Sequence, residues 1–387
     1  MGRIYLDHHV APPPHPKVVE RIAASLGDLF PASSGLHAES KTVREAIEWA
    51  RQRILQLITN GATGGELIFT GSGAEALCLG LLGYCRANGR FGRHVIISEI
   101  EHPALLQSAK QLEREGFVVD RIGVDHEGRL NEHEVFELMR EETILIGLQM
   151  ANPELGGVHS LGLIGQEARQ RGITFLVDGT LAEGCSLLDV QALKADLLVL
   201  SPRRFGGFSG VGVLYRSHRT VLEPLYWGGD QENGLRPGRE NLVGILAAGH
   251  AAEILVSEQV SRIQRSSSAR DRLLNLMKER ITPIQLNGPE LGSKRLCHHL
   301  SVMIPGVEAE GLVLFADLRG LAISTGGGCL SRGPESDYVM RAAGFSHEEA
   351  LHTISLGVAP HTTREEIIAA VEILVSGVER IRSMTPG

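Results

Sequence analysis

Lysine is scarce in this chain of 387 residues. Only six lysines occur, at positions 17, 41, 110, 194, 278 and 294, so most of the 38 basic residues are arginine. An arginine guanidinium stays protonated throughout the accessible pH range, whereas a lysine amine can lose its proton and attack a carbonyl. Because no lysine lies between Lys194 and Lys278, chemistry that needs a lysine amine in that stretch is excluded.

Cysteines are also few, and no two of them are close enough in the sequence to form a Cys-x-x-Cys pair. The five cysteines are Cys78, Cys85, Cys185, Cys297 and Cys329. Their spacing supports neither a disulfide framework nor a zinc site, and it favours a reducing cytoplasm. The segment MGRIYLDHH has neither the basic nor the apolar region of a secretory signal,. No apolar run reaches the ~18 residues of a membrane helix. We therefore expect a cytoplasmic protein with no membrane partner.

Like charges do not cluster in the sequence, although the net charge is −8. Nucleic acids and anionic membranes require a concentrated basic surface, so we exclude both as main partners. The chain is 43% hydrophobic and 22% charged, which is typical of a globular protein,. Its length predicts about two domains.

Short apolar runs rich in β-branched residues alternate with amphipathic helical stretches in the first two thirds of the chain. The predicted strands are 66–70, 94–98, 143–149, 174–178, 196–201 and 211–215, and helices such as 74–86 and 132–140 separate them. Apolar strands separated by helices predict an α/β fold with a mostly parallel sheet that is covered on both faces. In such a sheet, ligands bind at the carboxyl ends of the strands.

The pattern changes from about residue 254. A long helix through Met277, a strand over 300–304 and a glycine-rich loop near Cys329 follow one another. This order is typical of a smaller α+β domain. We predict a large domain over residues 15–253, and a small domain made of residues 1–14 and 254–387 that carries the cysteine loop.

Residues 70–75, Thr-Gly-Ser-Gly-Ala-Glu, follow one predicted strand and open the next helix. Glycines at Gly71 and Gly73 let backbone N–H groups turn toward one point, where the helix dipole also favours an anion. The segment is therefore a candidate phosphate site. The alternative is an ordinary tight turn between a strand and a helix.

Three polar side chains, His102, Asn152 and Asp178, also lie at or just after the ends of predicted strands. A histidine at such a place is either structural or catalytic. An aspartate there can pair with a protonated ring nitrogen or simply cap the next helix. Each residue taken alone leaves these alternatives open.

Taken together and in order, these features resemble the class V aminotransferases, and the chain is most similar to the cysteine desulfurases of the IscS/NifS type. The resemblance covers nearly the whole chain, including Tyr5-Leu6-Asp7 and residues 210–215. It implies the fold type I architecture of enzymes that use pyridoxal phosphate (PLP), with a large domain, a smaller α+β C-terminal domain and a homodimer. The site residues that it implies are Gly73 and Ala74 at the phosphate, His102 on the ring, Asn152 at the ring oxygen, Asp178 at the ring nitrogen, and Ser201.

Residues 324–329, Ser-Thr-Gly-Gly-Gly-Cys, resemble the mobile loop that carries the desulfurase nucleophile. In that family the loop cysteine attacks the sulfur of a PLP-bound cysteine and becomes a persulfide. Glycines before the cysteine suit a thiolate that must swing between a cofactor and an acceptor protein. The resemblance thus implies that Cys329 is catalytic, and the alternative is an inert buried cysteine.

The pattern breaks at the lysine that carries PLP in this family. Its Ser-x-His-Lys segment reads Ser201-Pro202-Arg203-Arg204 here, so Arg204 stands at the Schiff-base position. Arginine cannot form the Schiff base, because its guanidinium does not lose a proton. Other family residues are also replaced: the substrate-carboxylate arginine by Thr353, the ring-oxygen glutamine by Leu181, the phosphate-turn threonine by Ala74, and a threonine donated across the dimer by Arg239.

These replacements leave a basic site without an amine. Arg203, Arg204 and Arg239 would converge on the phosphate region and favour an anion, including PLP bound without an aldimine. The alternative is that these arginines pair with Asp or Glu. The favoured hypothesis is an atypical desulfurase-like protein in which Cys329 accepts or relays a persulfide.

Three further interpretations stay open at the level of sequence. The chain is a catalytically inactive binding or regulatory subunit that pairs with an active paralogue, or it holds PLP non-covalently and uses it. An iron–sulfur cluster ligated by Cys329 is the third. The expected partners are a second copy or a paralogue, and a sulfur-acceptor or scaffold protein.

Overall fold

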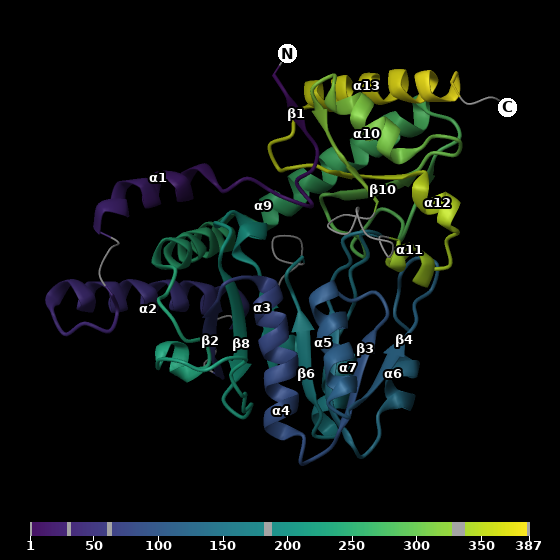
Figure 1. The fold of residues 1–387 in the computed structure, drawn as a ribbon. Coiled ribbons are helices and arrows are strands. Elements are labelled where there is room, and N and C mark those ends of the chain that lie inside the picture. The colour runs from purple at the N-terminus through teal and green to yellow at the C-terminus, as the bar shows by residue number, and fades with distance from the viewer. Residues whose placement is uncertain (1, 29–31, 60–63, 182–187, 327–336, 385–387) are drawn as a thin grey trace.

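The computed structural model describes residues 2–28, 32–59, 64–181, 188–326 and 337–384, and Cys185 and Cys329 lie outside them. A seven-stranded sheet organises the large domain, with the strand order β2-β8-β7-β6-β5-β3-β4 (Figure 1). Its strands are β2 Gly65–Thr70, β3 His94–Ser98, β4 Val118–Ile122, β5 Thr143–Gln149, β6 Thr174–Asp178, β7 Leu197–Leu200 and β8 Gly212–Ser217. The two pairs that involve β8, with β2 and with β7, are antiparallel, and the other pairs in this sheet are parallel. The predicted, mostly parallel α/β sheet is confirmed.

Alternating side chains of the strands face two hydrophobic clusters, one on each side of the sheet. Leu67 and Phe69 of β2 belong to the cluster that includes α2 and α9, while Ile68 belongs to the cluster under α3 and α5. The helices of this domain are α1 Pro16–Ser25, α2 Ala38–Thr59, α3 Gly73–Cys78, a π-helix Leu79–Gly83, α4 Tyr84–Asn88, α5 Pro103–Arg114, α6 Glu132–Leu138, α7 Gly162–Gln170 and α8 Val190–Leu193. Coverage of both faces explains why the central strands are apolar throughout.

The 39-residue helix α9, Leu242–Arg280, connects the two domains (Figure 1). Leu255 near its start packs in the core of the large domain, and Leu273 packs in a separate core of the small domain. The predicted division between residues 253 and 254 therefore falls inside a continuous helix. None of the described helices is long and apolar enough to cross a membrane.

The small domain contains an antiparallel sheet with the order β12-β13-β10-β9. Its elements are β1 Ile4–Tyr5, β9 Gln285–Leu286, β10 His299–Met303, α10 Ala309–Asp317, β11 Leu321–Ala322, β12 Ser324–Thr325, α11 Tyr338–Ala342, α12 His347–Leu351, β13 Thr353–Gly357 and α13 Arg364–Arg382. The N-terminal strand β1 pairs in parallel with β11, so the chain begins in the same domain in which it ends. This pairing brings residues 6–10 to the boundary between the domains.

Candidate active site

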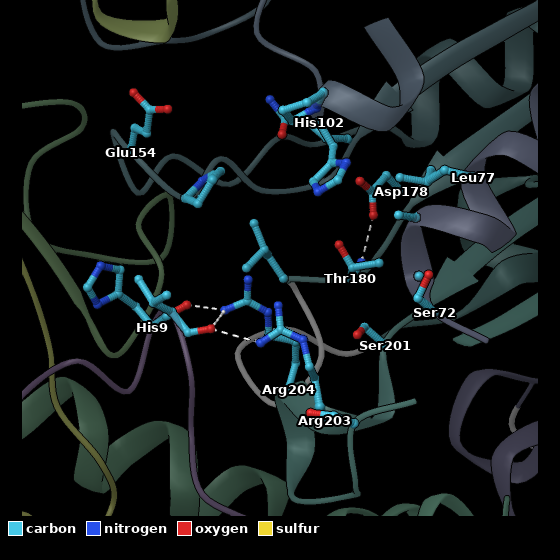
Figure 2. A pocket seen from close by; sticks show the side chains of 18 of the residues that line it. His9, Ser72, Leu77, His102, Glu154, Asp178, Thr180, Ser201, Arg203 and Arg204 are labelled. Carbon is cyan, nitrogen blue, oxygen red and sulfur yellow. Dashed lines mark hydrogen bonds between the residues drawn. The ribbon is translucent and has the colours of Figure 1, made fainter. Parts of the chain in front are cut away.

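A cavity of about 330 Å³ lies where the carboxyl ends of the large-domain strands meet the small domain (Figure 2). Residues that follow β2, β3, β5, β6 and β7 line it, as expected for a parallel sheet,. From the large domain these include Ser72, Gly73, Ala74, His102, Glu154, Asp178, Thr180, Leu181, Ser201, Arg203 and Arg204. From the small domain they include His9, Val10, Gly326, Tyr338 and Ser355.

The turn between β2 and α3 brings Gly73 and Ala74 to the wall of the cavity. The Ser72 hydroxyl accepts a hydrogen bond from the backbone N–H of Glu75 at 3.1 Å and caps α3. On the neighbouring strand, a Cβ at Gly212 would overlap the carbonyl of Ser72. A glycine is needed there because the two backbones approach so closely.

His102 and Asp178 each form a local hydrogen bond to the backbone and also face the cavity. His102 Nδ1 accepts the backbone N–H of Ala104 at 3.1 Å, and Asp178 Oδ1 accepts that of Thr180 at 2.9 Å. Both side chains also line the cavity. Burial lowers the pKa of His102; Asp178 opposes this effect, and the positive charges of Arg204 and Arg203 add to it. This electrostatic coupling places His102, Asp178 and the two arginines around the same space.

Arg203 and Arg204 lie on a short 3-10 helix, Pro202–Phe205, at the end of β7. Each guanidinium donates a hydrogen bond to the carbonyl oxygen of Val10, Arg203 at 2.8 Å and Arg204 at 2.9 Å, and Arg204 also donates to that of His9 (Figure 2). Within the described part of the chain, no carboxylate forms an ion pair with Arg203. All six lysines are described, and none of them lines the cavity.

Two predicted site residues lie elsewhere in this single chain. The Asn152 side chain accepts the backbone N–H groups of Glu154 and Leu155, both at 2.9 Å, and its amide donates to Ile100. Asn152 therefore shapes a turn and is not among the described residues that line the cavity. Arg239 is exposed and is not a lining residue either. Of the three arginines that were expected to meet at the phosphate region, a single chain therefore brings only Arg203 and Arg204 to the cavity.

The replaced carboxylate position, Thr353, is fully buried and does not line the cavity. Its hydroxyl donates to the carbonyl of Glu349 at 2.8 Å and accepts from Asn287 at 3.1 Å. Leu181, at the position of the ring-oxygen glutamine, does line the cavity but offers it no polar group. Cys329 lies outside the described residues, yet Gly326 and Tyr338, on either side of its segment, both line the cavity.

Two buried carboxyl groups were missed by sequence reasoning: Glu154 lines the cavity, and Glu101 lies next to the lining residue His102 in the chain. Burial raises the pKa of Glu101 to about 8, although hydrogen bonds from Ser98 and from the Gln149 N–H counteract the rise. Burial, aided by Asp337, raises the pKa of Glu154 well above its usual value. Glu101 and Glu154 sit in the motifs of His102 and Asn152, but only the packing shows that they are buried.

The chain matches the aminotransferase class-V family over residues 4–369. It is 36% identical to "Cysteine desulfurase IscS 1" of Archaeoglobus fulgidus over 384 residues, which cover 99% of this chain and 98% of that protein. It is 33% identical to "Cysteine desulfurase IscS" of Dictyoglomus turgidum over 383 residues, covering 99% and 96% of the two chains.

Solved structures agree with this assignment. A NifS-like protein has a TM-score of 0.89 at 24% identity, covering 97% of this chain and 98% of its own. The DndA protein of Streptomyces lividans has a TM-score of 0.76 at 26% identity, with coverage of 89% and 97%. The fold is that of the NifS-like, PLP type I proteins, as predicted. With matches of this length and identity, the chain belongs to the class V aminotransferase family and, within it, to the cysteine desulfurases.

Proposed function

We propose that this protein handles sulfur without a covalently bound cofactor, and that Cys329 carries the sulfur as a persulfide. The observation that carries the proposal is the end of β7, where Arg203 and Arg204 face the cavity and no lysine does. The segment containing Cys329 is flanked by Gly326 and Tyr338, which both line the same cavity. The arrangement supports a thiol that reaches the site, but it does not support an amine that holds PLP.

The residues present fit PLP only in part. His102 suits contact with a pyridine ring and Asp178 suits the ring nitrogen, while the turn at Gly73 and Ala74 suits a phosphate,. When PLP is bound it supplies an electron sink, but lysine attachment is how this family presents it. Because the lysine position is Arg204, only non-covalent binding of PLP or of a similar anion fits, and we route no step through it.

The proposed reaction is a thiol–persulfide exchange. The Cys329 thiolate attacks the outer sulfur of a donor persulfide, the donor S–S bond breaks, and the donor leaves as a thiolate. Cys329 then holds the outer sulfur and passes it to an acceptor thiol by the same exchange. No electrons are gained or lost overall. Positive charge from Arg203 and Arg204 favours a thiolate that enters the cavity.

Mass spectrometry after incubation with a low-molecular-weight persulfide tests this proposal. We expect the mass of one sulfur atom to be added at Cys329, and loss of the adduct on addition of an acceptor thiol. Cys329→Ser should abolish the adduct, whereas Cys78→Ser, whose thiol contacts Ser108 inside the protein, should keep it. Absence of any adduct at Cys329 in the wild-type protein would contradict the proposal.

The role of Arg204 is tested by Arg204→Lys. With PLP and borohydride we expect the wild-type protein to form no covalent adduct within the cavity, which no lysine lines, and the variant to form one at the substituted position, as located by peptide mass spectrometry. Arg203→Lys is the matched control, because it also introduces an amine at the cavity but not at the family's lysine position. A reducible adduct on a residue of the cavity in the wild-type protein would contradict the proposal, whereas adducts on surface lysines would be common to all three proteins.

Partners and metal content follow from the same proposal. We expect a dimer, formed with a second copy or with a paralogue, and a sulfur-acceptor or scaffold protein as the downstream partner. Light scattering of the pure protein distinguishes self-association from a requirement for a paralogue. An absorption spectrum after anaerobic purification tests the further prediction that Cys329 ligates an iron–sulfur cluster. If the pure protein is monomeric and binds an active paralogue, a regulatory subunit is the better description.

A further inference from the structure

The sheet of the small domain has one polar face that is buried as deeply as its apolar face. His299 and Ser301 of β10, and Thr353 and Ser355 of β13, all point to this side, and at most 1% of each residue is exposed. Leu300, Val302, Ile354 and Leu356 alternate with them and pack in the core of the small domain. A buried polar face needs a hydrogen-bond partner for each of its groups.

Several polar atoms at this face have no such partner among the residues described. They are His9 Nδ1, Asn287 Oδ1, Arg295 Nη1, Ser355 Oγ and both ring nitrogens of His299. Each of these residues is at most 3% exposed. Unpaired buried groups are few in native proteins, so several in one region indicate that something fills the space between them.

The same region contains a buried cation that has no ion-pair partner in contact with it among the described residues. Arg295 is 2% exposed, and it donates to the carbonyl oxygens of Pro289, at 2.6 Å, and of Asn287. No carboxylate in the described ranges forms an ion pair with Arg295, whereas its neighbour Arg270 pairs with Asp271 at 2.7 Å. Burial and the charge of Arg270 lower the pKa of Arg295 to about 10, while the carboxylates of Glu290 and Glu127 oppose this shift from a greater distance, so its guanidinium is charged at neutral pH. A buried guanidinium with no ion-pair partner is unfavourable unless an opposite charge comes into contact with it.

The unpaired nitrogens of Arg295 and His299 lie on the same side of Gly156. A Cβ on Gly156 would be 2.5 Å from His299 Nδ1 and 3.0 Å from Arg295 Nη1. The ring of His9 is 4.9 Å from that of His299, centroid to centroid. Because His9 and Ser355 also line the active-site cavity, this buried region adjoins that cavity.

We propose that a monovalent anion of halide size binds inside the protein, between Arg295 and His299, at the polar face of the small-domain sheet. A neutral imidazole offers one N–H and the guanidinium offers another at Nη1, so both can donate to the anion. A water molecule would satisfy these donors equally well, but it would bring no negative charge into contact with Arg295, whose nearest described carboxylates act only from a distance. The proposal does not depend on the sulfur chemistry of Cys329.

Diffraction from crystals of the full chain grown in sodium bromide, measured at the bromine absorption edge, tests the site directly. We expect an anomalous peak within hydrogen-bonding distance of Arg295 Nη1 and of a ring nitrogen of His299. Water alone at this position, or bromide only at surface positions, overturns the proposal. Added hydrosulfide should reduce the peak if this sulfur anion is the natural occupant, whereas a peak that persists favours a halide.

Asn287→Asp provides a matched variant, because it introduces a near-isosteric carboxylate at the same buried polar face, on the residue whose backbone carbonyl accepts from Arg295. At constant ionic strength, replacing gluconate by chloride should raise the Tm of the wild-type protein by about 3 °C. The shift should vanish in Asn287→Asp, and bromide should be absent from its crystals. An equal shift in both proteins would show that chloride acts elsewhere. If the variant does not fold, the diffraction result on the wild-type protein decides alone.

Discussion

The two sides of the active-site cavity bury ionisable groups of opposite kinds. On the large-domain side, burial raises the pKa values of Glu101 and Glu154. On the small-domain side, burial lowers those of His9 and His299 well below the usual value. At neutral pH Glu101 and the two histidines are therefore held mainly in their neutral forms, the pKa of Glu154 is shifted in the same direction as that of Glu101, and the permanent positive charge at the cavity comes from Arg203 and Arg204. The two sides should respond to pH in opposite directions.

The largest expected effect concerns the carboxyl side. Folded Glu101 binds its proton up to a pKa of about 8, whereas an unfolded glutamate releases it near its usual value. The folded state thus binds more protons, and the free energy of unfolding should fall by up to about 1.4 kcal/mol per unit as pH rises from about 5 to 8. Glu101→Gln should flatten this slope in urea unfolding curves. Exposed Glu99→Gln should not, and equal slopes in all three proteins would contradict the assignment.

Replacing Arg295 should give the next largest effect on stability. The comparison with Arg203 tests whether the fully buried arginine contributes more than an arginine of the cavity. Arg295→Met leaves the buried carbonyls of Pro289 and Asn287 without their donor, so we expect a loss of about 3 kcal/mol in the free energy of unfolding,. Half-buried Arg203→Met removes one contact with Val10 and should cost about 1 kcal/mol or less,. Similar losses in the two variants would show that burial does not distinguish these arginines.

Acid sensitivity of the histidine side is expected to give the smallest effect, because it is measured only from pH 6.5 down to 5. Folded His299 has a pKa well below 6.5, so its stabilising contribution is present above about pH 6.5 and is lost as pH falls. The free energy of unfolding should drop by about 1.4 kcal/mol per unit between pH 6.5 and 5. His299→Gln should weaken this dependence, and exposed His133→Gln should leave it unchanged. An unchanged dependence in His299→Gln would place the acid-sensitive group elsewhere.

Sequence reasoning predicted the sheet well where strands are buried on both faces. The bounds of β3, β5 and β6 agree with the prediction to the residue. It missed β4, Val118–Ile122, because this edge strand mixes Asp120 and Arg121 with apolar residues. An edge strand has a neighbouring strand on one side only and is more exposed to solvent on the other. Its sequence therefore does not form a continuous apolar run.

The site was predictable where a motif sits directly at a strand end. Gly73, His102, Asp178 and Arg204 follow strands and reach the cavity. Asn152 also follows a strand, but its side chain is used by the turn that it starts. The pairing of β10 with β13, and the unpaired Arg295 beside it, depend on contacts between distant segments and are not visible in the sequence.

The contacts of Arg204 determine what a lysine at this position would cost the structure. The guanidinium holds the N-terminal segment by the carbonyls of His9 and Val10. A single change to lysine would introduce an amine and, at the same time, release part of that anchorage. A variant with an amine here would therefore need compensating changes near residues 9 and 10 to keep this segment in place. Arg204 thus ties the chemistry that the cavity can offer to the position of the first residues of the chain.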